Sequence, residues 1–320
     1  MTANKINYIN IGLMLVSCVV AFFIPFELFL FSYGVLGPLH YLTEIGWLHK
    51  KNYFTKGKYD FMFLSLICVA LFYYTFYPTK DHLLVADLIA FSFFISIVFV
   101  FVKDWLYRIV LTILTIIVVS VINNFNNYFI WIGIFLPTII HVFIFTWLFM
   151  LYGVLKEKSF SGFLSIVVLI ICAISFFVIQ PQGLNYKVSD TVRANYHMFD
   201  LLNFNLIQLF HLDSLTKMTD IFERNSGFVV MRLVAFAYTY HYLNWFSKTS
   251  VIKWHQVPKK VLIATLVIWL GAVAIYLYDY NLGVRALFFL SFLHVFLEFP
   301  LNFFSVNGIG KEIMSLGKAK

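Results

Sequence analysis

Long apolar runs alternate with short polar breaks along most of the 320-residue chain. A run of about 20 apolar residues is what an α-helix needs to cross the hydrocarbon core of a bilayer. We therefore expect an all-α fold, a polytopic integral membrane bundle that occupies 1–320 as a single transmembrane domain. The pattern predicts ten transmembrane helices, at 8–24, 27–48, 59–78, 83–102, 105–123, 128–152, 159–179, 226–246, 261–281 and 284–304.

One long polar segment, 180–225, interrupts this pattern and is expected to form an external loop. Within it, Phe199, Leu202, Leu206 and Leu209 recur at helical spacing among Asp and Asn residues. Such a pattern predicts an amphipathic helix, which either lies in the membrane interface or packs on the surface of the bundle.

Composition excludes a water-soluble domain. Hydrophobic residues make up 62% of the chain and charged residues 12%, against about 25% charged in an average soluble domain. The three cysteines, Cys18, Cys68 and Cys172, lie far apart inside apolar runs, so neither a disulfide framework nor a haem-attachment motif is present.

The net charge of +8 indicates membrane orientation rather than nucleic-acid binding. If the N-terminus is cytoplasmic, most of the 23 Lys and Arg residues fall in loops on the cytoplasmic side, as the positive-inside rule requires. We therefore expect both termini in the cytoplasm and the protein in the inner (plasma) membrane of a bacterium.

Ionisable side chains inside the spans are the candidate chemistry, because an unpaired charge inside a bilayer is strongly unfavourable. His40 and Glu44 lie four residues apart on one face of span 27–48, and His294 and Glu298 repeat this spacing in span 284–304. Spans 128–152 and 226–246 add His141 and His241, and all four spans run in the same direction. Imidazoles and carboxylates facing into a bundle are ligands for iron or a similar metal. The expected metal ligands are His40, Glu44, His141, His241, His294 and Glu298, with Glu44 and Glu298 also expected to be catalytic.

Four further residues are expected near this site. His49 and His255 are outer ligand candidates on the cytoplasmic side. His49 joins the site only if its helix bends or ends, because nine residues place it opposite His40. His255 joins it only if the helix of His241 continues past Ser247. Asn244 and Tyr238 could orient a ligand through hydrogen bonds. For any one of these histidines, the competing interpretation is a buried imidazole that hydrogen-bonds a tyrosine or a backbone carbonyl.

These residues favour an integral-membrane metalloenzyme. The leading hypothesis is a non-haem iron or di-iron oxidoreductase, an oxygenase, desaturase or hydroxylase, with a hydrophobic lipid, acyl or isoprenoid substrate and a soluble electron donor. The set resembles that of the membrane-bound desaturases and hydroxylases in its ligand types and in its expected position in the cytoplasmic half of the bilayer. The HxxHH boxes of that group are absent. The alternatives are a zinc-dependent membrane lipid hydrolase, a haem-binding electron carrier and a proton-coupled transporter. Gly-rich nucleotide-binding motifs, HExxH and GxSxG are absent.

Overall fold

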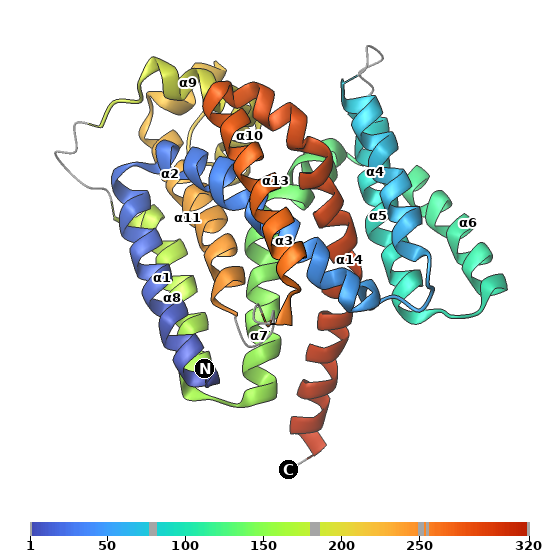
Figure 1. Cartoon of the computed structure of the whole chain (residues 1–320). Coiled ribbons are helices and arrows are strands. Elements are labelled where there is room, and N and C mark those ends of the chain that lie inside the picture. The colour runs from blue at the N-terminus through green and yellow to red at the C-terminus, as the bar shows by residue number, and fades with distance from the viewer. Residues whose placement is uncertain (1, 77–81, 180–185, 249–252, 254–255, 319–320) are drawn as a thin grey trace. The chain divides into compact units, whose positions relative to one another are not determined.

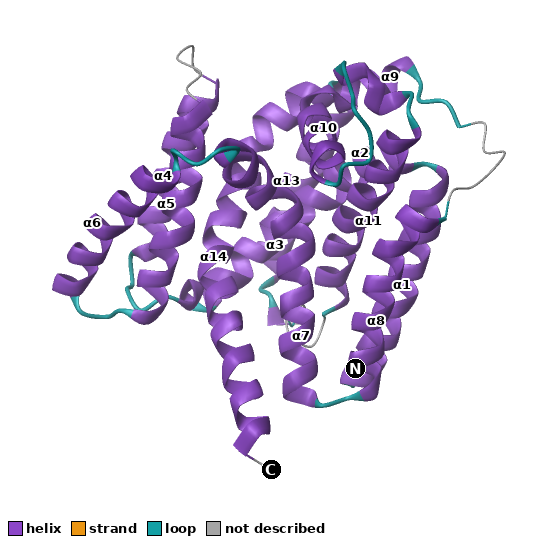
Figure 2. Ribbon diagram, turned by 180° about the vertical axis from the view of Figure 1, so that it is seen from behind, coloured by secondary structure: helices purple, strands orange, loops and turns teal. Residues whose placement is uncertain are grey.

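The computed structural model describes residues 2–76, 82–179, 186–248, 253 and 256–318. The protein is 87% helical, and no strand occurs among these residues (Figure 2). The helices form two compact units, which are described separately. The first unit comprises Met1–His40 with Glu157–Arg285, and the second comprises Tyr41–Lys156 with Ala286–Lys320.

Seven helices among the described residues are long and apolar enough to cross a membrane, which confirms the expected class of an apolar helical protein. They are α1 (Ala3–Phe23), α5 (His82–Phe101), α6 (Trp105–Ile122), the consecutive helices η3 (Phe129–Phe145) and α7 (Thr146–Glu157), α8 (Phe160–Val178), α13 (Lys259–Tyr278) and α14 (Tyr280–Lys318). In α6 and in α13 only 11% of the apolar stretch is buried by protein. A bilayer is the environment that would cover such faces.

Three expected spans do not meet the same requirement of length and hydropathy. Helix α4 (Asp60–Phe76) has 17 residues, and the span expected at 27–48 is divided into α2 (Pro25–Phe31), η1 (Ser32–Leu36) and α3 (Gly37–Lys50). Helix α11 (Asn225–Ser247) is long but rich in polar residues. The number of ten spans therefore stays a prediction, and two of these three segments carry candidate site residues.

The first unit is built around α11, which is buried along nearly all its length from Ser226 to Asn244. Helices α1, α2, α8 and α10 (Asp200–Leu209) pack around it (Figure 1). Because protein rather than lipid surrounds α11, this helix can carry polar side chains that a lipid-facing helix could not.

The polar segment 180–225 adds short helices to the first unit where it is described. These are α9 (Asp190–Tyr196), η4 (His197–Phe199), α10 and η5 (Met218–Phe222). The helix expected near Phe199–Leu209 is α10, and it packs on α11: the buried Asn203 amide accepts a hydrogen bond from the Tyr196 hydroxyl at 2.9 Å and lies against Met231.

The second unit has an aromatic and aliphatic core contributed by α3, α4, α5, η3, α7 and α14. A short 3₁₀ helix, η2 (Asn52–Phe54), connects α3 to α4. At the start of α4, Asp60 accepts two hydrogen bonds from the Arg108 guanidinium, at 2.6 and 3.1 Å. This ion pair joins α4 to α6 and satisfies a largely buried carboxylate.

Candidate metal centre

The chain enters α3 through a wide helical turn that is fixed from two sides. The five residues of η1 have π-helical hydrogen bonding, a form often found at functional sites. The Ser32 hydroxyl is 2.7 Å from the hydroxyl of Thr239 on α11. The Trp269 indole of α13 donates to the Val35 carbonyl at 2.8 Å. The start of α3, and with it His40, is thereby held against α11 within the first unit.

His40 and His241 meet directly in the first unit. Their Nε2 atoms are 3.1 Å apart and their rings are inclined at 70°. Two Nε2 atoms that each lie about 2.1 Å from one ion, as in zinc or iron sites, subtend an angle of about 95° at this separation. That angle lies between octahedral and tetrahedral values, so the pair has the spacing of two adjacent ligands of one metal ion.

An aromatic wall encloses this pair. The ring of His40 lies 5.0 Å from Tyr242 and 5.7 Å from Trp245, both on α11. Gly37 allows this packing, because a Cβ there would come within 3.3 Å of the Tyr242 hydroxyl. The rotation of the His40 ring is therefore restricted by its neighbours on α11.

The second unit gathers the other four expected ligands. His141 lies in η3, a π-helical segment that contains Pro137. Its Nδ1 is 3.5 Å from Oε2 of Glu298 on α14, and its ring centroid is 5.2 Å from that of His294 one turn earlier. Pro137 supplies no backbone N–H for a regular α-helical hydrogen bond, and the segment around it is π-helical. The wider π-helical turns change the helical register before His141.

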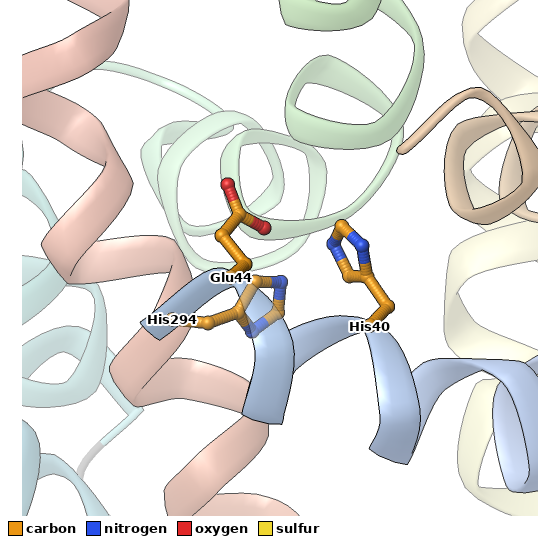
Figure 3. Close-up of side chains that lie close together, drawn as sticks. All are labelled: His40, Glu44 and His294. Atoms are coloured by element: carbon orange, nitrogen blue, oxygen red, sulfur yellow. The ribbon is translucent and has the colours of Figure 1, made fainter. Parts of the chain in front are cut away.

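Glu44 connects these residues to helix α3. Glu44 lies one turn after His40 on α3, and within the second unit one of its carboxylate oxygens lies within 4.8 Å of a ring nitrogen of His294. Figure 3 shows His40 and Glu44 on successive turns of α3 and His294 on α14. Two imidazoles and one carboxylate are the donors of many non-haem iron sites.

All six expected ligands are buried, each with at most 6% of its surface exposed. An ionised carboxylate or imidazolium in such surroundings requires a compensating charge or donor. A divalent cation between imidazoles and carboxylates would supply this compensation, and it would be held by deprotonated ligands. The donor set therefore fits a metal ion.

Of the four remaining predicted residues, one lies near the end of α3, two lie on α11 and one is outside the described residues. His49 is exposed near the end of α3, where its Nδ1 is 3.2 Å from the Tyr53 hydroxyl. Helix α11 ends at Ser247, and His255 lies outside the described residues. Asn244 is buried on α11, and the Tyr238 ring packs against Phe29 at 5.0 Å.

Sequence reasoning did not single out several residues that line the site. Tyr41 is buried with its ring 5.7 Å from that of His294, and Tyr242 and Trp245 enclose His40. Trp245 lies four residues after His241, a helical spacing that could have indicated it. Asn302 is buried one turn beyond Glu298. In the described part of the chain neither atom of its amide group has a hydrogen-bond partner.

Comparison of the chain with protein family models, with curated proteins and with solved structures finds no match. Any functional conclusion consequently depends on the side chains described above.

Proposed function

We propose that the protein is an integral-membrane metalloenzyme, a non-haem iron or di-iron oxidoreductase that acts on a hydrophobic lipid, acyl or isoprenoid substrate. The observation that carries the proposal is the 3.1 Å separation of the two buried Nε2 atoms of His40 and His241. Within the second unit, Glu44 lies beside His294 and adds a carboxylate, the second donor type of a non-haem iron site.

The number of candidate protein ligands supports either more than one metal ion or one metal ion with coordination positions left open for other ligands. The first unit offers two imidazoles and the second unit offers two imidazoles and two carboxylates, and in total these are more than the four ligands of an ordinary zinc site. His141 and Glu298, which approach each other to 3.5 Å, would complete a second position. When bound, iron with open positions would supply oxidative chemistry, and we propose that the buried carboxylates Glu44 and Glu298 would accept or donate a proton.

The spacing of His40 and His241 favours this proposal over a haem clamped by these two residues. Axial histidines approach haem iron from opposite sides, whereas a 3.1 Å separation corresponds to adjacent ligands. A zinc-dependent lipid hydrolase would use the same residues, with the metal activating a water molecule. A proton-coupled transporter would use Glu44 and Glu298 without bound metal.

The membrane setting belongs to the same proposal. Ten spans with both termini in the cytoplasm of a bacterium would place the site in the cytoplasmic half of the bilayer, where a soluble electron donor could reach it. Cysteine labelling of intact cells at positions near Lys5 and Lys311 would test the orientation, because membrane-impermeant reagents should not reach either end.

Metal analysis of the purified full-length protein is the decisive experiment. Wild-type protein should contain at least one iron per chain by elemental analysis, without haem absorption. His40→Ala, His241→Ala and His294→Ala should each lose most of it. His49→Ala is the matched control on α3 and should retain wild-type metal content, since His49 is exposed and contacts Tyr53.

The outcomes separate the alternatives. Stoichiometric zinc in place of iron would favour the hydrolase, and a haem spectrum would favour the electron carrier. Protein that is folded, as isolated and after incubation with Fe(II), yet free of bound metal would contradict the metalloenzyme proposal and leave the transporter.

A further inference from the structure

Arg232 is a buried cation that the proposed metal centre does not use. It lies inside α11 with 7% of its surface exposed. A guanidinium stays protonated at any physiological pH, so the charge cannot be removed by deprotonation. A charge in this position requires an anionic partner.

The described part of the chain supplies no such partner. Nε and Nη1 of Arg232 have no hydrogen-bond partner there, and no ion pair among these residues includes Arg232. The acidic residues of the surrounding first unit are largely engaged elsewhere. Glu27 accepts from the Tyr186 hydroxyl, Glu223 pairs with Arg193, and Asp213 pairs with Arg224. Segment 180–185, outside the described residues, contains no Asp or Glu.

The surroundings of Arg232 place it near the ends of two apolar helices. Its guanidinium lies over the Phe22 ring at 5.5 Å, and Phe22 packs on Phe176 at 4.9 Å. Phe22 is the next-to-last residue of α1, and Phe176 lies two residues before the end of α8. Val178 and Ile179, at the end of α8, are apolar and exposed, as expected for side chains that contact lipid. Membrane headgroups are expected at the level where apolar spans end.

We propose that Arg232 binds the phosphate group of a membrane phospholipid. The planar guanidinium can donate two parallel hydrogen bonds to phosphate oxygens. No described residue accepts a hydrogen bond from its Nε or Nη1. This site is separate from the metal centre, because Arg232 and His241 lie nine residues apart and so on opposite faces of α11.

The test uses full-length protein in detergent, washed free of lipid, with thermal unfolding as the readout. It is titrated with short-chain phosphatidylglycerol, with a diacylglycerol of the same chains, and with inorganic phosphate. Phosphatidylglycerol should stabilise the wild type, and Arg232→Gln should weaken its apparent affinity about tenfold or more, as expected for loss of a charge-assisted contact. Arg224→Gln is the matched control and should bind like the wild type, since Arg224 already pairs with Asp213.

The arms of the titration identify the source of the phosphate. Stabilisation by phosphatidylglycerol but not by diacylglycerol supports a lipid headgroup. An equal response to inorganic phosphate, abolished in Arg232→Gln, supports the site with a free oxyanion as its ligand. Equal affinities of wild type and Arg232→Gln would overturn the proposal. If that variant does not fold, an equal response of the wild type to phosphatidylglycerol and diacylglycerol overturns it without any substitution.

Discussion

The Nε2 atoms of His40 and His241 lie 3.1 Å apart, although the two residues are 201 positions apart in the chain. With both rings neutral, only one of these nitrogens can carry the hydrogen between them, and the other must accept it. A metal ion that replaces this hydrogen would bind both lone pairs. The arrangement therefore connects metal binding to the packing of the start of α3 against α11 within the first unit.

Metal should stabilise the protein through this pair. For chelator-treated wild type, Fe(II) or Zn²⁺ at 100 times its dissociation constant should raise the free energy of unfolding by about 2.7 kcal/mol. His40→Ala and His241→Ala should lose most of this increase, because each removes one ligand. Thermal unfolding in detergent measures the effect. A full metal-dependent increase in His241→Ala would show that the ion binds elsewhere.

Gly37 should be required for the aromatic wall around His40. A Cβ at this position would lie 3.3 Å from the Tyr242 hydroxyl, so Gly37→Val must displace the Tyr242 ring. Overpacking of this kind destabilises by about 1–3 kcal/mol, and it should also lower metal affinity. Gly46→Ala on the same helix is the control, since nothing lies within 4 Å of its added Cβ. If both variants unfold at the wild-type temperature, Tyr242 does not constrain the site.

Local spacing allowed part of the site to be predicted. His40 and Glu44 had to share a face of any helix that contains them, and the structure places both on successive turns of α3. The same helical periodicity placed His49, nine residues after His40, on the opposite face of the helix. The spacing of His294 and Glu298 on α14 follows from the same periodicity.

The partners of these residues could not be predicted, because helical periodicity does not say which helices are neighbours. Nothing local shows that Tyr41 packs against His294, or that His141 meets Glu298. The π-helical turns of η1 and η3 also change the register, and a 3.6-residue period does not anticipate them.

Hydropathy identified the exposed apolar helices α6 and α13 and the site helices η3 and α14, whereas it identified α11 poorly. Helix α11, predicted as the span 226–246, is less apolar than the seven candidate spans, because it is enclosed by α1, α2 and α8 and can carry Arg232 and His241. A buried helix of this kind looks like a weak span in the sequence, and only the packing explains its polar residues.

The ion pair between Arg108 and Asp60 should stabilise the second unit through its geometry. Arg108→Lys keeps the charge but cannot form both hydrogen bonds to the carboxylate. We expect a loss of about 1–2 kcal/mol in the free energy of unfolding, and a larger loss for Arg108→Gln, which leaves Asp60 without a cation. Lys103→Gln, at a nearby exposed position, should have no effect. Equal stability of Arg108→Lys and the wild type would mean that the second hydrogen bond contributes nothing.

Asp200, at the start of α10, should make stability depend on pH. Burial raises the pKa of its carboxyl above the ordinary value of 3.8, and the contact with His197 opposes this effect only in part. The folded state therefore binds the proton more tightly than the unfolded state does. This contribution to stability is complete below about pH 4 and is lost as pH rises through the folded-state pKa.

Asp200→Asn removes this titration, so its stability relative to the wild type should increase from pH 4 to pH 7. Thermal unfolding of both proteins across that range measures the difference. His197→Gln is the informative companion, because it removes the opposing contact at 2.9 Å and should make the wild-type pH dependence steeper. A constant difference between wild type and Asp200→Asn at every pH would show that the Asp200 carboxyl titrates alike in the folded and unfolded states.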